Sequence, residues 1–123
     1  KVVALIVGIG TDLVELARIE KSLQRFGERF AKRVLVETEL TEYRQAKAQV
    51  AFLGKRFAAK EAISKVLGFG MRQGVSFSCI SVTHTESVKP TVELSDAARK
   101  VAQDRGILSW HLSISDEKQY AVA

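Results

Sequence analysis

Apolar residues open the chain in an almost unbroken run. Residues 2–9 read VVALIVGI, and such a run predicts a strand that is buried on both faces. From residue 13 to residue 26 apolar side chains then recur at spacings of three and four, at Leu16, Ile19, Leu23 and Phe26. This period predicts an amphipathic helix, which Thr11 or Asp12 would cap and Gly27 would end.

The middle of the chain has a helical pattern. We expect a short helix over residues 28–36, followed by another that starts at Thr38 or Thr41. Residues 49–67 contain no proline and are rich in Ala, Lys, Glu and Leu, which predicts a long helix. Its buried side is expected to consist of Phe52, Ala59, Ile63 and Val66. Glycines at positions 68, 70 and 74 then open a loop.

Strand patterns dominate the last third of the chain. We expect strands over residues 77–83 and 91–94, joined by a turn at Lys89-Pro90. Ser95 would cap a helix that ends at Gly106. Because these strands and helices do not alternate as regular βαβ units, the pattern predicts an α+β fold.

Strict alternation marks the C-terminal strand. Between residues 110 and 115 every second residue is apolar, so one face would carry Trp110, Leu112 and Ile114. The opposite face would carry His111, Ser113 and Ser115. A turn over residues 116–118 would lead into a returning strand with Tyr120 and Val122.

Composition narrows the class of protein. The chain has 123 residues, of which 46% are hydrophobic and 27% charged. This is typical of one globular domain, and we expect residues 1–123 to form it. The apolar run at residues 2–9 is far shorter than the ~20 residues of a membrane helix, and no signal peptide is recognisable. The single cysteine, Cys79, would be a buried core side chain. These features favour the cytoplasm.

The net charge of +5 indicates a negatively charged partner. Charge alone does not distinguish nucleic acid, an acidic protein and a phosphorylated small molecule. Arg18, Lys21 and Arg25 line up on the polar face of the helix expected over residues 13–26.

Asp12 is the first candidate for a chemical role. It lies in the segment GIGTDLVE, residues 8–15, directly after the expected strand. A carboxylate held by a rigid element at a sheet edge suits a metal ligand. The alternative is that Asp12 only caps the following helix by accepting its free N–H groups.

A second candidate group lies on the long helix, within RFAAKEAISK at residues 56–65. Glu61 and Lys65 are four residues apart and share a helix face, which could be no more than a surface ion pair. Arg56 and Lys60 are like charges at the same spacing, and they repel each other unless an anion lies between them. This pattern suits a site that holds phosphates near a bound cation, or a plain solvated face.

The two histidines are weaker candidates. His111 would point away from the core, to solvent or into an interface, and His84 is expected to be structural or solvated. The glycine loop at residues 68–74 follows a helix, whereas a dinucleotide or P-loop fingerprint precedes one. The sequence has no zinc-binding pattern and no nucleophile elbow.

Taken together and in this order, the motifs resemble the bacterial holo-acyl-carrier-protein synthases, the short, single-domain group of the 4′-phosphopantetheinyl transferases. The resemblance covers the chain from about residue 7 to its end. It is carried by GIGTDLVE (8–15), RIE (18–20), KRFAAKEA (55–62) with Lys65, KP (89–90) and HLSISD (111–116). Val88 stands where the family often has glycine before Lys-Pro.

The resemblance implies the α+β fold of that family, in which a mixed antiparallel sheet packs against the long helix. It also implies the reaction. These enzymes transfer the 4′-phosphopantetheine arm of coenzyme A to a serine hydroxyl of apo acyl carrier protein, for fatty acid biosynthesis. The transfer requires Mg²⁺ and releases adenosine 3′,5′-bisphosphate. The family is trimeric with active sites between subunits, so His111 could serve a neighbouring subunit. No nucleic acid or membrane partner is implied.

The resemblance also assigns site residues. The metal-binding carboxylates fall on Asp12 and Glu61, and the lysine that meets the coenzyme A phosphates falls on Lys65. Arg56 and His111 match positions near the 3′-phosphate and the adenosine end of coenzyme A. Pro90 and the loop at Gly68 match segments that shape the nucleotide pocket. Arg18 matches the basic position that engages the carrier protein, and we extend that surface to Lys21 and Arg25.

The chemistry is compatible with these residues. Mg²⁺ prefers oxygen ligands and needs only one or two carboxylates when the substrate brings phosphates. Phosphoryl transfer requires positioning and charge stabilisation and no protein nucleophile. The acceptor of the serine proton could be Glu61 or a metal-bound water, and the sequence leaves both open.

Two other functions remain compatible with the sequence. A basic nucleic-acid-binding module would use the positive charge, although the aromatic residues fall on expected core faces and no RNA- or DNA-binding motif is present. A non-catalytic adaptor would bind an acidic protein through Arg18, Lys21 and Arg25 without any dependence on Mg²⁺.

Overall fold

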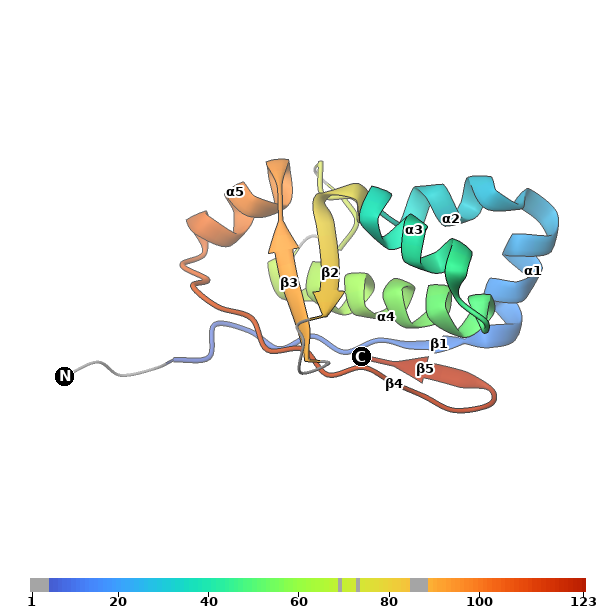
Figure 1. Ribbon diagram of the computed structural model, residues 1–123. Helices are drawn as coiled ribbons and strands as arrows, with labels where there is room; N and C mark the ends of the chain where they lie inside the picture. The colour runs from blue at the N-terminus through green and yellow to red at the C-terminus, as the bar shows by residue number, and fades with distance from the viewer. Residues whose placement is uncertain (1–4, 69, 73, 85–88) are drawn as a thin grey trace.

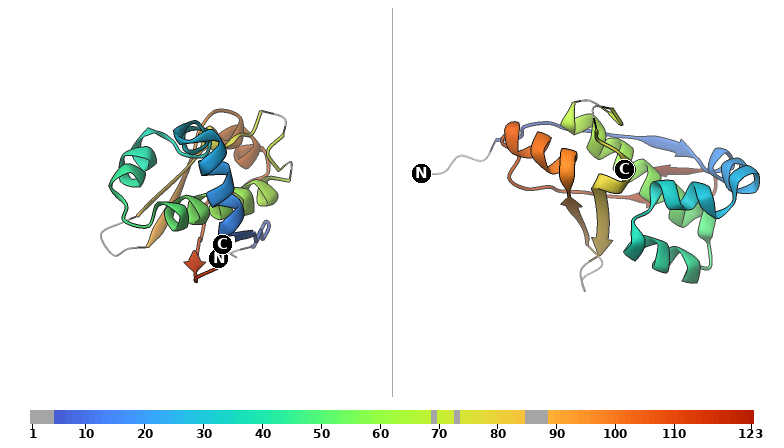
Figure 2. Two further views of the ribbon diagram at one scale, coloured as in Figure 1. Left: turned by 90° about the vertical axis from the view of Figure 1, so that its right-hand side faces the viewer. Right: turned by 90° about the horizontal axis from the view of Figure 1, so that it is seen from above.

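The computed structural model describes residues 5–68, 70–72, 74–84 and 89–123. A long helix, α4 (Gln49–Leu67), runs through the middle of the molecule (Figure 1). Three shorter helices gather around its N-terminal half: α1 (Leu16–Phe26), α2 (Glu28–Val34) and α3 (Glu37–Gln45). At the other end lies α5 (Asp96–Asp104), as the view from above also shows (Figure 2).

Two small antiparallel sheets complete the fold, and the α+β class expected from the sequence is confirmed. The hairpin of β2 (Ile80–His84) and β3 (Pro90–Leu94) crosses one side of α4, with Val82 opposite Val92. The second sheet has the order β1–β5–β4 and contains β1 (Leu13–Glu15), β4 (Ser115–Asp116) and β5 (Tyr120–Val122). The N–H groups of Asp12 and Ala123 each donate to the carbonyl of the other residue at 3.0 Å, which extends the β1–β5 pairing.

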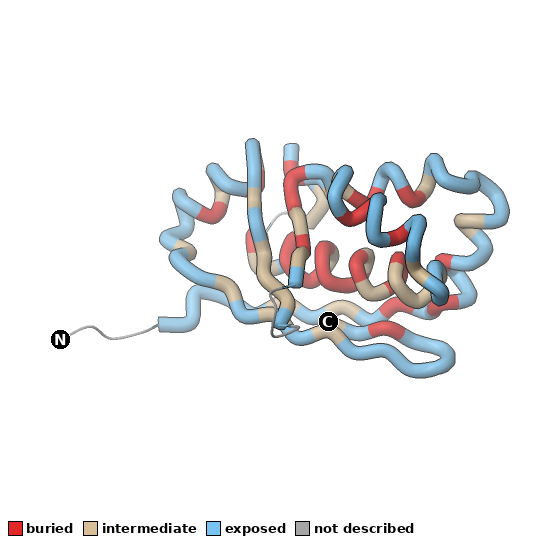
Figure 3. Tube along the Cα trace, viewed as in Figure 1, coloured by how far each residue is buried: buried red, intermediate tan, exposed pale blue. Residues whose placement is uncertain are grey.

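Helix α4 spans the expected residues but is buried on more than one side (Figure 3). Leu53 and Ala58 belong to a core cluster with α1–α3, whereas Ile63 and Leu67 belong to a second cluster with the β2–β3 hairpin and α5. The sequence therefore predicted only part of the buried surface of α4. Phe52 and Val66 are only half-buried, while the polar side chains of Arg56, Lys60 and Ser64 are buried.

The prediction of a buried strand over residues 2–9 is wrong for the part that the structure describes. Residues 5–9 form no strand, and Leu5 and Ile6 are 83% and 80% exposed. The first strand is β1, which takes the residues where the next helix was expected to begin, so α1 starts only at Leu16. An apolar run becomes a strand only where a partner strand pairs with it, and β5 pairs with residues 13–15. Gly27 ends α1 with a φ of +61°, as expected.

Smaller differences concern where strands begin. Residues 77–79 form a 3₁₀ turn, η1 (Phe77–Cys79), so β2 starts at Ile80. The alternation at residues 110–115 is present as alternating burial, yet the backbone pairs as a strand only from Ser115. Cys79 is a free and buried thiol. The expected glycine loop includes residues 69 and 73, and the turn before Lys89 includes Val88; these three positions lie outside the described residues.

No helix in the described ranges combines the length and apolar character that crossing a membrane requires.

Candidate active site

Asp12 and Lys65 meet although they are 53 positions apart in the chain. The Lys65 Nζ donates to Asp12 Oδ1 at 3.0 Å and to the Thr11 carbonyl at 2.9 Å. The segment before Asp12 lies directly against α4, because a Cβ on Gly10 would overlap the carbonyl oxygen of Ala62. Glycine at this position therefore permits the close approach that brings Asp12 to the helix.

Glu61 belongs to the same cluster. It lies one helical turn before Lys65, on the half-buried side of α4. Burial raises the pKa of Glu61, the negative charge of Asp12 raises it further, and Lys65 partly opposes both. The fold thus brings together two carboxylates and one ammonium group, as the sequence motifs predict.

Asp12 does not act as a helix cap. Helix α1 begins at Leu16 after Glu15, and no side chain caps its N-terminus. The carboxylate of Asp12 is instead paired with Lys65, with 17% of its side chain exposed. The structural alternative weighed for Asp12 is therefore wrong.

In the described part of the chain no group of three His, Cys, Asp or Glu side chains could hold a metal ion. The pair of Asp12 and Glu61 nevertheless fits Mg²⁺, which is often held by one or two carboxylates together with substrate phosphates. The donor set consists of hard oxygen atoms. Burial is the main cause of the raised pKa of Glu61 and the charge of Asp12 adds to it, so a cation near both carboxylates would favour their charged forms.

Arg56 and Lys60 surround an anion, but the anion belongs to the protein. Glu39 on α3 is fully buried, and its Oε1 accepts a hydrogen bond from Lys60 Nζ at 2.6 Å. Its Oε2 lies 3.5 Å from Arg56 Nε. The interpretation of Lys60 as part of a phosphate-binding face is therefore wrong, because its side chain is 0% exposed and points into the core.

This network ties α4 to its neighbours. Glu39 also accepts the backbone N–H groups of Val36 at 2.8 Å and Val82 at 2.9 Å. Lys60 Nζ further donates to the carbonyls of Val34 at 2.6 Å and Phe77 at 3.3 Å. Burial lowers the pKa of Lys60, and the negative charge of Glu39 counteracts that effect.

Sequence analysis missed Glu39. A glutamate on the third residue of a helix that accepts the N–H before that helix is a known capping pattern. The signal was hidden because the helix was expected to start at Thr38 or Thr41, whereas α3 starts at Glu37. Nothing in the local pattern indicated that Arg56 and Lys60 would contact this glutamate.

Arg56 is 3% exposed and lies at a corner shared by three elements. Its guanidinium lies over the ring of Phe52, with Cζ 4.6 Å from the ring centroid. Its Nη2 is 3.5 Å from Oε2 of Glu42, the next acidic residue on α3. His84, at the end of β2, is close enough for the Arg56 charge to lower its pKa, an effect that adds to the larger one of burial.

The other predicted nucleotide-pocket residues lie at the end of α4, at the start of β3 and on the segment before β4. Gly68 ends α4 with a φ of +93°, and the guanidinium of Arg105 lies against it. Pro90 opens β3 directly opposite His84, so both Arg56 and Pro90 neighbour that histidine. His111 is exposed. The Gly68 N–H donates to the backbone carbonyl of Lys65 at 3.1 Å. Among the described residues no hydrogen bond or ion pair joins Pro90 or His111 to Asp12, Glu61 or Lys65.

The basic residues expected on α1 are all exposed. Arg18, Lys21 and Arg25 lie at spacings of three and four along this helix. Phe26 beside them is 43% exposed, and the Arg25 guanidinium lies 5.1 Å from its ring centroid. We call this set of four side chains the α1 basic face.

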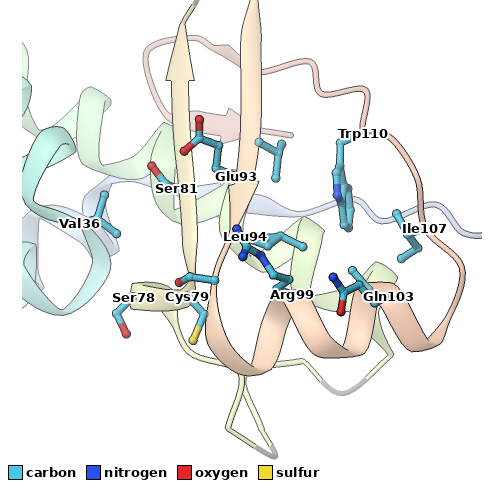
Figure 4. Close-up of a pocket in the computed structure, with 13 residues that line it drawn as sticks. Val36, Ser78, Cys79, Ser81, Glu93, Leu94, Arg99, Gln103, Ile107 and Trp110 are labelled. Atoms are coloured by element: carbon cyan, nitrogen blue, oxygen red, sulfur yellow. The ribbon is translucent and has the colours of Figure 1, made fainter.

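A groove of about 480 Å³ lies between the β2–β3 hairpin and α5 (Figure 4). Its lining includes Ser81, Glu93, Arg99 and Trp110, which the close-up shows around the opening. None of the predicted site residues lines it. The candidate active site is therefore the cluster at Asp12, Glu61 and Lys65, and the groove is a separate feature.

Comparison with known proteins gives the family of this chain. Residues 8–123 match the 4′-phosphopantetheinyl transferase superfamily. The chain is 53% identical over 118 residues to the holo-[acyl-carrier-protein] synthase of Vibrio parahaemolyticus, covering 96% of this chain and 94% of that protein.

Solved structures with a similar fold belong to the same family. The holo-[acyl-carrier-protein] synthase of Neisseria meningitidis has a TM-score of 0.90 at 43% identity, over 96% of this chain and 94% of that one. The Bacillus anthracis synthase, solved in complex with CoA (3′,5′-ADP), has a TM-score of 0.80 at 40% identity, over 97% and 93%.

The chain therefore belongs to the 4′-phosphopantetheinyl transferase superfamily and is an enzyme of that class. Within the superfamily its relatives are holo-[acyl-carrier-protein] synthases, which confirms the family that the sequence motifs indicated.

Proposed function

We propose that this chain transfers the 4′-phosphopantetheine group of coenzyme A to a serine hydroxyl of apo acyl carrier protein. The second product is adenosine 3′,5′-bisphosphate. One catalytic domain over residues 1–123 carries the reaction, which serves fatty acid biosynthesis in the cytoplasm. The free, buried thiol of Cys79 is compatible with a reducing compartment.

The convergence of Asp12, Glu61 and Lys65 carries this proposal. Two carboxylates and an ammonium group at one place suit a pyrophosphate with its counter-cation, and they offer little to a nucleic-acid backbone or a purely structural partner. The likeness to synthases with the same fold, one of them solved with CoA (3′,5′-ADP), supports the same substrate for this chain.

Asp12 and Glu61 would hold the Mg²⁺ ion. When bound, this ion would neutralise negative charge on the pyrophosphate as its bond to the leaving nucleotide breaks. The ammonium group of Lys65 would act at the same place. It would release Asp12 and donate hydrogen bonds from Nζ to the phosphate oxygens.

Glu61 is the proposed acceptor of the serine proton. The serine oxygen attacks the phosphorus that bears the pantetheine arm, and the bond to the nucleotide phosphate breaks with its electron pair. A carboxylate has two oxygen atoms, so one of them would remain free to accept the proton while the other faces the cation. No covalent protein intermediate is required.

The nucleotide end of coenzyme A would bind at Arg56, Gly68, Pro90 and His111. Arg56 and Pro90 both lie near His84, so these two residues of the proposed nucleotide pocket belong to the same region of the fold. His111 is exposed and lies on a different segment. We propose that it completes the site of a neighbouring subunit in a homotrimer.

Exposed apolar side chains at Leu5, Ile6, Ile9 and Leu13 support such an assembly, since a surface of this kind is typically covered by another chain. A solution mass of a single chain, measured together with full activity, would exclude the trimer.

The direct test is to incubate the protein with coenzyme A, Mg²⁺ and an apo acyl carrier protein. We expect the mass of the carrier to rise by about 340 Da, the mass of the transferred arm, in a displacement that needs no protein nucleophile. The adaptor alternative predicts carrier binding without a mass change. The nucleic-acid alternative predicts salt-sensitive binding to random oligonucleotides and no binding of coenzyme A.

The α1 basic face would dock the acidic carrier protein. Replacing Arg18 with glutamate should raise the KM for the carrier about 5- to 30-fold, because one favourable charge pair becomes a repulsive one. The KM for coenzyme A should stay the same. Steady-state kinetics with each substrate varied in turn measures both constants.

Arg99→Glu on α5 is the matched control, since it makes the same charge reversal at the opposite end of the molecule (Figure 2). Equal effects of Arg18→Glu and Arg99→Glu on the carrier KM would mean that only net charge matters and that α1 is not a docking surface.

A further inference from the structure

Arg56 poses a problem for the proposed nucleotide pocket. A residue that meets a phosphate needs free N–H groups, yet Arg56 is only 3% exposed. Phe52 covers one face of its guanidinium, Glu39 lies at Nε and Glu42 lies at Nη2. At Nε and Nη2 a phosphate would therefore compete with a carboxylate that already lies there.

Two of the neighbours are poor candidates for such an exchange. Glu39 accepts from Lys60 and from two backbone N–H groups and is 0% exposed, so its displacement would leave several buried donors without partners. Phe52 lies within α4 and packs against Tyr43, with ring centroids 6.2 Å apart. Glu39 is therefore held in place, and Phe52 has no charge that a phosphate could replace.

Glu42 is different from both. Half of its side chain is exposed, and its contact with Arg56 Nη2 is long, at 3.5 Å. Such partly exposed ion pairs contribute little to stability. A phosphate monoester carries more negative charge than a carboxylate and accepts hydrogen bonds at three oxygens, so it can replace Glu42 at the same N–H group.

We infer that Glu42 sets the affinity of this chain for the nucleotide. Its carboxylate covers the outward N–H groups of Arg56 in the free enzyme and must leave before the 3′-phosphate of coenzyme A binds there. The inference rests on the proposed function, in which Arg56 meets that phosphate. Glu42 is thus a specificity-determining residue that competes with the substrate.

His84 provides a reporter for this exchange. Its pKa is lowered by burial and by Arg56, and the negative charge of Glu42 opposes these effects. A phosphate dianion at Arg56 would bring more negative charge close to the ring, so the pKa of His84 should rise when coenzyme A binds. The chain has two histidines, so the His84 signal in an NMR titration can be assigned with a His84→Gln variant.

The test measures dissociation constants by isothermal titration calorimetry for coenzyme A and for 3′-dephospho-coenzyme A, which lacks only the phosphate in question. We expect Glu42→Gln to bind coenzyme A about two- to fivefold more tightly than the original chain, because a competing ion pair of this kind is worth about that factor. Its affinity for 3′-dephospho-coenzyme A should not change. Only coenzyme A should raise the pKa of His84.

Glu37→Gln is the matched control. It removes the same charge from the same helix at an exposed residue. Equal tightening by Glu37→Gln and Glu42→Gln would mean that the effect is general electrostatics, and it would overturn the inference. An unchanged or weakened affinity of Glu42→Gln for coenzyme A would overturn it as well.

A double variant separates this inference from the proposed function. In an Arg56→Gln background, Glu42→Gln should no longer tighten coenzyme A binding, because the guanidinium for which Glu42 and the phosphate compete is absent. If the original chain transfers phosphopantetheine but Glu42→Gln gains no affinity, only the inference fails. If the original chain binds neither nucleotide, the proposed function fails and the inference fails with it.

Discussion

Replacing Glu61 with glutamine should abolish phosphopantetheine transfer while the protein stays folded. Glutamine keeps the size of the side chain but removes one of the two carboxylates proposed to hold Mg²⁺. Residues that only support a metal ligand typically cost 10- to 100-fold when changed, so loss of a ligand should cost more than about 100-fold in kcat. The carrier mass assay at saturating coenzyme A measures this loss.

The same substitution, Glu61→Gln, should not lower the free energy of unfolding. The pKa of Glu61 is raised, so the fold disfavours its charged form, and this unfavourable contribution is largest at a pH above the raised pKa. Glutamine removes it, and the free energy of unfolding of the metal-free protein at neutral pH should stay equal or increase. Thermal unfolding with and without Mg²⁺ should show that the ion raises the Tm of the original chain only.

Glu93→Gln on β3 is a suitable control, because its carboxylate is exposed and lies outside the proposed site. Full activity of Glu61→Gln, or an undiminished Mg²⁺ effect on its Tm, would contradict the assignment of Glu61 as a ligand.

Replacing Glu39 with alanine should give the largest loss of stability in the chain. The change leaves Lys60 and Arg56 buried without the carboxylate that lies between them, and it also removes the acceptor for the Val82 N–H. Breaking a buried ion pair by removing one partner typically costs about 3–5 kcal/mol. Urea denaturation, with the midpoint and the slope determined separately, measures this cost.

Two further variants make the result interpretable. Glu37→Ala removes an exposed carboxylate from the same helix and should change the free energy of unfolding by less than about 0.5 kcal/mol. Glu39→Gln keeps an oxygen acceptor but loses the charge, and its cost should lie between the two. A cost below about 1 kcal/mol for Glu39→Ala would mean that the network is not a structural centre.

These two glutamates differ in how far the sequence revealed them. Glu61 was predicted as a site residue because its face shared with Lys65 follows from helix geometry, and because the family resemblance implies a role for both residues. Glu39 contacts Lys60 across 21 positions of the chain. No local pattern encodes such a contact, and its partner helix was expected to start one or more residues too late.

The N-terminal run illustrates a different limit. Its apolar character was clear from the sequence, but whether it forms a buried strand depends on a partner. In the described structure β5 pairs with residues 13–15, and Leu5 stays 83% exposed. The hydrophobicity of a segment indicates that its burial would be favourable. Whether another part of the fold packs against that segment is decided only by the tertiary structure.

By itself, the sequence determined the α+β class, the bounds of α4 and the family, since all of these depend on local period or on motif order. It also predicted which residues carry the chemistry. The tertiary structure decided the pairing of Asp12 with Lys65, the burial of Lys60 with Glu39, and the covering of Arg56 by Glu42. These contacts join segments that are distant in the chain. The physical reason is that the charge of a side chain is fixed by its type, whereas its solvent exposure and its partners are fixed by packing.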